Sequence, residues 1–180
     1  MTILTIGHSN HSLAKLVGLL HDNGVMTVVD VRTAPYSRYS PQFAREQLEA
    51  ALPHDHLRYI YAGKHLGGRP TDPSCYKRGA LPSGDRDYLR EVDYSAVMTR
   101  DWFVRGMDRL LDLAAEQATA IMCSEEDPAR CHRHHLIARY LMARRPETTI
   151  QHIRGTGLVL QAGAIPNLVD KPLVVQGSLF

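Results

Sequence analysis

Short apolar segments and amphipathic segments alternate along the chain. Residues 2–6, TILTI, are rich in β-branched side chains and end at Gly7, a pattern that predicts a strand. From Leu13 to Leu20, leucine and valine recur at the spacing of one helical face, and Gly24 follows as a helix end. The chain is therefore expected to begin with a strand, a turn and a helix.

Four more apolar segments have the length of strands. Residues 25–31 are apolar almost without alternation, which is typical of a strand covered on both faces of a parallel sheet. Residues 63–100 contain many Gly, Pro, Arg and Asp residues and little periodicity, and a stretch that long without clear structure is usually functional, mobile or misread. The remaining elements are strands at 56–61, 119–123 and 148–153, and helices from Pro41, from Asp101 to about Gln117, and from Pro128.

This order of strands and helices predicts one three-layer α/β domain over residues 1–180, with a mostly parallel sheet. We expect a doubly wound strand order 3-2-1-4-5, numbered along the chain, with residues 156–180 as a hairpin and an irregular tail. Ligands in such sheets bind beyond the carboxyl ends of the strands, where the winding reverses. Residues at those strand ends are therefore the first candidates for a site.

The composition argues against disordered, membrane and secreted classes of protein. Of the 180 residues, 44% are apolar and 22% are charged, as in ordinary globular proteins. The N-terminus lacks the basic and apolar regions of a signal peptide, so we expect a cytoplasmic protein with no membrane partner. Three cysteines, an odd number, do not suit a disulfide framework. The net charge of +2 is too small to indicate a nucleic-acid partner by itself.

Polar side chains follow three of the expected strands. His8 and Ser9 come after the first strand, Asp30 and Arg32 close the second, and the sequence CSEE, residues 123–126, follows the fourth. Any one of these clusters could be only the polar turn that a strand end needs. Because the carboxyl ends of parallel strands meet at one edge, their coincidence favours a shared site.

The segment CSEEDPARCHRHH, residues 123–135, contains two of the three cysteines. Asp127 and Pro128 fit a helix cap and a first-turn proline, which would place Cys131 and His132 near a helix N-terminus. The helix dipole there can lower the pKa of a thiol and attract an anion. This predicts reactive or anion-binding chemistry close to the two residues.

Arg133 shares a helical face with apolar residues, so its guanidinium should point toward the sheet. An inward arginine needs a partner, and Glu125, Asp30 or a ligand phosphate could serve. A purely structural ion pair and a ligand contact both remain open.

Metal and redox chemistry are weaker alternatives for Cys123 and Cys131. Structural zinc sites favour two cysteines a few residues apart, whereas seven residues separate this pair and no second knuckle exists, so we expect no metal here. A redox pair needs Cα atoms within about 7 Å, which a returning loop permits. A tyrosine-phosphatase loop is excluded because the loop after Cys123 contains acidic residues where a phosphate cradle needs small ones.

Two further segments collect basic side chains. Arg38 lies beside Ser37 and, with Arg32, would place two guanidiniums beyond the second strand, where planar donor forks suit phosphate. Lys64, His65 and Arg69 surround the glycine pair Gly67–Gly68, a motif that is most often only a turn. Nearby tyrosines would also allow stacking of nucleic-acid bases.

Several of these motifs occur together in a known family. Five segments occur in this order: TIGHS, VVDVRTAPYSR, LGG, FVRGMDRLLDLA and MCSEEDPARCHR. Together they resemble the bacterial and archaeal family called domain of unknown function 488, over roughly residues 2–155. The resemblance implies an α/β fold with a Rossmann-like sheet, and it implies no activity. The motif positions are His8, Ser9, Asp30, Arg32, Ser37, Arg38, Gly67, Gly68, Cys123, Glu125, Cys131, His132 and Arg133.

Our leading hypothesis is an enzyme that acts on a phosphate-bearing small molecule, a nucleotide or a nucleic-acid end; its cofactor, if any, is unknown. The alternatives are a non-catalytic nucleic-acid or nucleotide-binding module and, more weakly, a metal or thiol-redox protein. The catalytic candidates are Cys123, Glu125, Cys131, His132 and Asp30. The ligand-binding candidates are His8, Ser9, Arg32, Ser37, Arg38, Gly67, Gly68 and Arg133.

Overall fold

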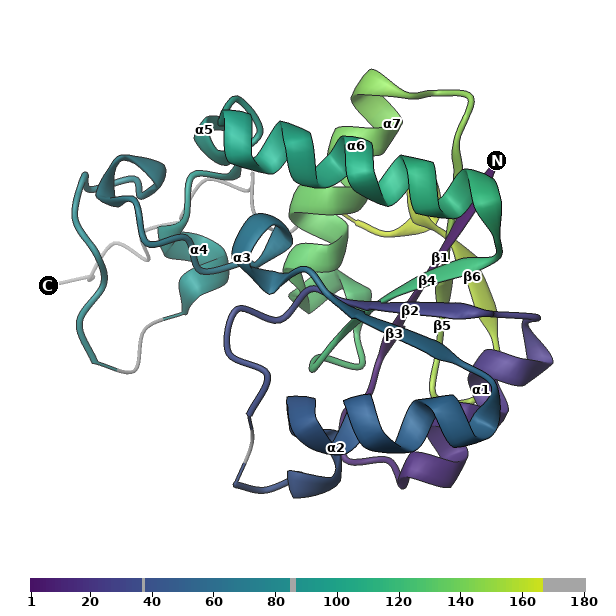
Figure 1. Ribbon diagram of the computed structural model, residues 1–180. Helices are drawn as coiled ribbons and strands as arrows, with labels where there is room; N and C mark the ends of the chain where they lie inside the picture. Colours follow the sequence, from purple (N-terminus) through teal and green to yellow (C-terminus); the bar gives the residue numbers. More distant parts are fainter. Residues whose placement is uncertain (37, 85–86, 167–180) are drawn as a thin grey trace, which may run out of the picture.

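The computed structural model describes residues 1–36, 38–84 and 87–166 (Figure 1). In this part of the chain the strands form one six-stranded sheet in the order β3-β2-β4-β1-β5-β6. β1 to β5 run parallel to their neighbours, and β6 pairs antiparallel with β5 as the predicted hairpin. The strands are β1 Thr2–Gly7, β2 Thr27–Asp30, β3 Arg58–Tyr61, β4 Thr119–Cys123, β5 Thr149–Ile153 and β6 Val159–Gln161.

The predicted α/β class and the mostly parallel sheet are confirmed, but the strand order 3-2-1-4-5 is wrong. β4 lies between β2 and β1, and Thr119 pairs with Ile3 on one side and with Thr27 on the other. The hydrophobic pattern of a strand indicates how deeply the strand is buried, but not which strands pair with it. β1 and β4 are both buried almost throughout, so the sequence could not show which of them occupies the centre.

Helices cover both faces of the sheet (Figure 1). On one face, α1 Leu13–Asp22 and α2 Arg45–Ala51 pack on a core that contains Leu4, Ile6 and Met122. The other face carries α6 Asp101–Glu116 and α7 Arg139–Arg144. Alternate residues of a strand point to opposite faces, so the sheet lies between two apolar layers.

The helix expected from Pro128 is broken, and the break lies at the candidate site. Pro128–Arg130 forms a short 3-10 turn, Cys131 is extended at φ −135° and ψ 142°, and a π-helical turn Arg133–Ala138 precedes α7. The Asp127 side chain caps the first turn by accepting from the Ala129 N–H. Cys131 and His132 therefore lie at the N-terminus of the second helical segment, near a helix start as predicted, with Cys131 extended and His132 as the N-cap residue.

Residues 63–100 contain short elements that cover the carboxyl edge of the sheet. They are α3 Gly63–Leu66, a 3-10 turn Pro73–Cys75, α4 Tyr88–Glu91 and α5 Tyr94–Val97. Tyr76 and Val92 form an isolated antiparallel bridge that closes this excursion. The segment therefore lies beside the strand ends and contains short elements that the sequence pattern does not predict.

Candidate functional site

A pocket of about 740 Å³ opens at the carboxyl ends of β1, β2 and β4. The predicted meeting of Ser9, Arg32 and Cys123 at one edge of the sheet is confirmed, since all three line it. Residues of the 63–100 segment complete its wall. The lining includes His8, Ser9, Arg32, Gly68, Arg69, Tyr88, Cys123, Glu125, Arg130, Cys131 and His132.

The loops after β1 and β4 continue the pairing of the two strands. The backbone N–H of His8 donates to the Cys123 carbonyl at 2.9 Å, and that of Ser9 donates to Ser124 at 2.8 Å. A Cβ atom at Gly7 would overlap the carbonyl oxygen of Glu125. Glycine at position 7 therefore lets the two loops touch, and this contact fixes the back of the pocket.

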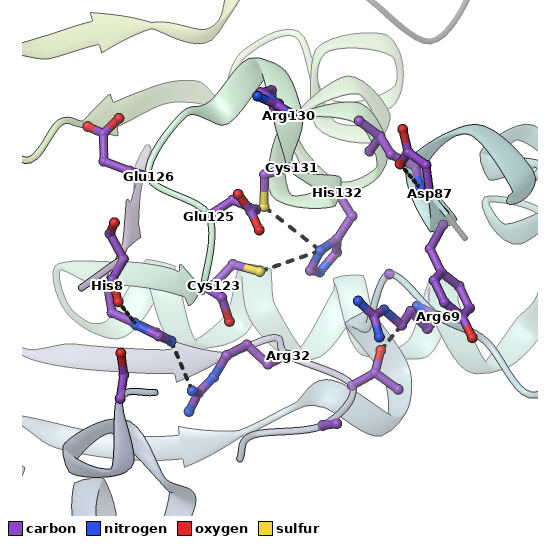
Figure 2. A pocket seen from close by; sticks show the side chains of 18 of the residues that line it. His8, Arg32, Arg69, Asp87, Cys123, Glu125, Glu126, Arg130, Cys131 and His132 are labelled. Atoms are coloured by element: carbon purple, nitrogen blue, oxygen red, sulfur yellow. Dashed lines mark hydrogen bonds between the residues drawn. The ribbon is translucent and has the colours of Figure 1, made fainter. Parts of the chain in front are cut away.

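Cys123, Cys131 and His132 form a buried cluster at the base of the pocket, with both sulfurs directed at the imidazole ring (Figure 2). Nδ1 of His132 lies 3.6 Å from Sγ of Cys123 and 3.9 Å from Sγ of Cys131. The other ring nitrogen, Nε2, donates to the carbonyl of Val31 at 3.1 Å. Because a carbonyl only accepts, Nε2 carries a proton, and Nδ1 is the ring nitrogen that faces the sulfurs.

The two cysteines are free thiols whose sulfurs lie within 4.8 Å of each other, so the loop between them does return. Burial raises the pKa of Cys131, but the hydrogen bond from Cys123, the charge of Arg133 and the contact with His132 outweigh it. The pKa of Cys131 therefore lies well below its ordinary value. Cys123, which donates its S–H to Cys131 and is buried, has a raised pKa. Cys131 is the sulfur that carries negative charge more readily.

Gly68 fixes the place of the imidazole. A Cβ atom at position 68 would lie 2.5 Å from Cγ of His132. At Gly67 it would overlap Oγ1 of Thr33, in the wall between the pocket and a neighbouring cavity of about 520 Å³. The glycine pair, predicted as ligand-binding, is thus required for close packing around His132 and Thr33.

Asp30 and Arg32 form a buried ion pair on the β2 side of the pocket, with Nη2 of Arg32 2.6 Å from Oδ2 of Asp30. Tyr59 donates its hydroxyl to the same oxygen at 2.7 Å, and Arg32 also donates to the Phe43 carbonyl. Nη1 of Arg32 donates to Nε2 of His8 at 3.1 Å. Burial and the nearby Arg32 charge lower the pKa of His8 to about 4. This network occupies the Asp30 carboxylate, which was predicted as a possible acid or base.

Arg133 points inward as predicted, but its partners are backbone groups. Its fully buried guanidinium donates to the carbonyls of Glu125 and Glu126, and Nε donates to Oγ1 of Thr5 at 3.2 Å. Neither the Glu125 carboxylate nor the Asp30 carboxylate pairs with it. The geometry gives Arg133 a positioning role, holding the loop after β4, in place of the expected direct contact with an anion.

Glu126 is also structural. Its carboxylate pairs with Arg154 at 2.7 Å and accepts from the Gly155 N–H. The hydrogen bond from Arg154 is the main reason that the pKa of Glu126 falls to about 2. Glu125, in contrast, is exposed at the pocket, and among the described residues its carboxylate forms no ion pair.

The arginines that reach the pocket opening differ from those predicted. Arg38 is exposed and does not line the pocket, and Ser37 lies outside the described residues. Arg69 and Arg130 do line it, and within the described ranges neither forms an ion pair; Arg69 lies over the ring of Tyr88 at 4.3 Å. The sequence analysis noted Arg69 beside the glycine pair and missed Arg130, whose only signal was its place before Cys131.

Comparison with known proteins shows the family. Residues 12–141 match the family described as Domain of unknown function DUF488. The chain belongs to the DUF488 family. The matched range of this DUF488 chain contains the Cys123–His132 cluster and Arg32, and it ends short of the predicted limits at residues 2 and 155. No curated protein and no solved structure matches the chain.

The structure divides the motif positions of the DUF488 chain into two groups. Asp30, Arg32 and Arg133 have their hydrogen-bonding groups engaged inside the protein. The side chains of Cys123, Cys131 and His132 face the pocket (Figure 2). Among the described residues, none of the helices is long and apolar enough to cross a membrane.

Proposed function

We propose that this DUF488 protein is an enzyme that binds a phosphate-bearing small molecule or nucleotide in the pocket and acts on it at the Cys123–Cys131–His132 cluster. The observation that carries this proposal is the approach of both sulfurs to Nδ1 of His132, whose ring is oriented by Val31. A reactive group, a base within reach and a third group that orients the base are the parts that activated thiols and thiolates require.

The pocket has the size and charge for such a substrate. Its volume of about 740 Å³ lies within the usual range for small-molecule sites, roughly 300–1,000 Å³. Arg69 and Arg130 bring two guanidiniums to its opening, and planar guanidinium groups bind phosphate through paired hydrogen bonds. Glu125 lines the same pocket and supplies a carboxylate for proton transfer.

Exposed aromatic side chains favour a second candidate, a module that binds single-stranded nucleic acid. Tyr36 and Tyr39 are 71% and 98% exposed, with the exposed Arg38 beside them, and Tyr36 lines the pocket. Bases stack on such rings without sequence preference, and binding then falls steeply with salt. A defined small ligand with turnover supports the enzyme, whereas salt-sensitive binding of any long polynucleotide without turnover supports the module.

The anion site is tested by thermal unfolding with phosphate, pyrophosphate, and nucleoside mono- and triphosphates at constant ionic strength. A ligand at one hundred times its dissociation constant should stabilise the fold by about 2.7 kcal/mol. We expect the shift in the wild type and its loss in an Arg69→Ala, Arg130→Ala double variant.

Arg58→Ala is the matched control for that double variant. Arg58 is exposed and lies at the first residue of β3, at the opposite edge of the sheet from the pocket. This variant should keep the full shift. Equal shifts in all three proteins, or no shift in the wild type, would remove the anion-binding proposal.

A further inference from the structure

We propose that Cys123, Cys131 and His132 bind a transition-metal ion, most suitably Zn²⁺, with its fourth coordination position open to the pocket. The site deepens the proposed function by naming its catalytic centre: with a metal bound, the two thiolates are ligands and a bound water is the nucleophile. The substrate part rests on that function. Metal binding itself can be measured without any substrate.

The separations of the three donor atoms fit tetrahedral zinc. Zinc lies about 2.3 Å from thiolate sulfur and about 2.0–2.1 Å from imidazole nitrogen, so a tetrahedral site places sulfur and nitrogen about 3.5 Å apart. Here Nδ1 of His132 lies 3.6 Å from one sulfur and 3.9 Å from the other, and all three atoms lie within 4.8 Å. The nitrogen–sulfur separations need to change by only a few tenths of an ångström. The two sulfurs, which a tetrahedral zinc holds about 3.8 Å apart, need to approach each other by up to about 1 Å.

The three donor atoms lie close to one another. Cys123 donates its S–H to Cys131, and both sulfurs lie within 3.9 Å of Nδ1 of His132. A metal ion among the three atoms accepts a lone pair from each of them. Convergence of three soft donors on one point is what a zinc site requires.

The surroundings of the donors match those of metal ligands. A histidine that binds a metal usually donates its other N–H to a carbonyl or carboxylate, and Nε2 of His132 donates to Val31. The backbone N–H of Arg133 lies 3.5 Å from Sγ of Cys131, where it stabilises a thiolate. Gly68 leaves no space for the imidazole to turn aside. Each thiol would release its proton to solvent as its sulfur binds the metal.

The expectation of no metal rests on the short cysteine spacing of structural zinc knuckles, which this sequence lacks. In this fold, Cys123 ends β4 and the 124–130 loop returns Cys131 beside it, so the spacing along the chain no longer matters. Catalytic zinc sites combine three protein ligands, including sets of two cysteines and one histidine, with a bound water. Three protein donors beside a pocket correspond to this second class of site.

The chemistry that follows is hydrolysis of the phosphate-bearing substrate. A metal ion lowers the pKa of its bound water toward neutrality. That water gives one proton to Glu125, and its oxygen forms a bond to the electrophilic atom of the substrate. The bond to the leaving group then breaks, and the leaving group takes the proton from Glu125.

The first experiment measures metal on the full chain purified without chelator. Elemental analysis should find one zinc per chain. After removal of zinc by chelator, titration with Co²⁺ should give the intense visible bands of tetrahedral cobalt and an ultraviolet thiolate charge-transfer band, both saturating at one equivalent. Because this readout uses the wild type, it does not depend on whether a ligand variant folds.

Variants then locate the site. The variants Cys123→Ser, Cys131→Ser and His132→Gln each lose a ligand. Loss of only the hydrogen-bond partner of a ligand typically weakens metal affinity by about 10- to 100-fold, so each variant should weaken zinc binding by more than that. Cys75→Ser is the matched control, because Cys75 is a buried free cysteine outside the cluster, and it should bind one zinc with unchanged affinity.

Two results would overturn the metal site: failure of the chelator-treated wild type to bind Zn²⁺ or Co²⁺ at one equivalent, or equal binding in Cys131→Ser. The phosphate-dependent shift in thermal unfolding separates the two proposals. One zinc per chain without that shift removes the phosphate-bearing substrate and keeps the metal. The shift without stoichiometric metal keeps the proposed function and removes the metal.

Discussion

The two sides of the pocket base differ in the kind of groups they bring together. On the β2 side, the Asp30 carboxylate accepts from Arg32 and Tyr59, and Arg32 also donates to His8 and Phe43. On the β4 side, two sulfurs face one ring nitrogen of His132. We call these the closed side and the sulfur side.

Burial does not distinguish the two sides, since Asp30, Arg32, Cys123 and Cys131 are all at most 6% exposed. The kind of interaction does. Charged groups on the closed side pair with one another, and such a buried network stabilises one conformation. The sulfurs of Cys123 and Cys131 and Nδ1 of His132 are instead three possible ligands for one metal ion.

Breaking the closed side should have the largest effect on stability. Arg32→Met leaves the Asp30 carboxylate buried without its cation, which typically lowers the free energy of unfolding by about 3–5 kcal/mol. Chemical denaturation measures the change. Arg45→Met is the control, because the Arg45–Glu49 pair is exposed and its loss should change stability by less than about 1 kcal/mol. Equal effects of the two substitutions would contradict the structural role of Arg32.

The closed side should also weaken in acid. The pKa of His8 is about 4 in the folded protein, against 6.5 for the ordinary residue, so the unfolded chain takes up the proton first. The stability from neutral His8 is complete above pH 6.5 and is lost as the pH falls toward 4, with a slope of up to about 1.4 kcal/mol per pH unit.

The His8 contribution is measured by chemical denaturation from pH 7 to pH 4. His8→Gln should flatten the dependence, whereas His54→Gln, at an exposed position, should leave it unchanged. A pH profile that is the same in His8→Gln and the wild type would show that His8 does not titrate as described.

On the sulfur side, Gly68→Ala should impair ligand geometry more than stability. The added methyl group would displace the His132 ring, and we expect zinc affinity to fall by about 10- to 100-fold, as when a ligand loses its supporting contact. Gly18→Ala is the control: a Cβ there meets nothing within 4 Å, so affinity should be unchanged. Calorimetric zinc titration compares them, and equal affinities would mean that Gly68 does not position His132.

The smallest change in stability is expected for Arg130, which lines the pocket at its opening. Arg130→Ala should alter the free energy of unfolding by no more than about 0.5 kcal/mol, because the side chain is exposed and among the described residues forms no ion pair. The same variant should reduce the shift in unfolding temperature caused by phosphate. A large loss of stability would contradict this expectation and would show that Arg130, like Arg32, stabilises the fold.

Continuous periodicity made parts of the fold predictable from sequence. The helix from Asp101 and the strand at 119–123 were placed within a residue or two, because each has an unbroken apolar pattern. The hairpin partner of β5 and the inward direction of Arg133 were also foreseen. The order of strands was not, since it depends on which equally apolar strands pair across long connections.

The sequence predicted where the candidate site lies better than it predicted what each residue does there. Strand-end clusters pointed to the pocket, but the extended conformation of Cys131 interrupts a sequence that reads as one helix. That break aims Cys131 and His132 at the end of β4, and no local pattern reveals it. Arg130 lines the pocket, a position that the sequence did not reveal, whereas Arg133 is fully buried and points inward as predicted.

We infer that a metal ion completes the sulfur side. Anomalous diffraction at the zinc absorption edge, from crystals grown without chelator, would locate it. We expect one anomalous peak within about 2.0–2.3 Å of the Cys123 sulfur, the Cys131 sulfur and Nδ1 of His132, with its remaining side toward the pocket. A disulfide between the two cysteines, or the three side chains in these positions with no anomalous peak after addition of zinc, would contradict it.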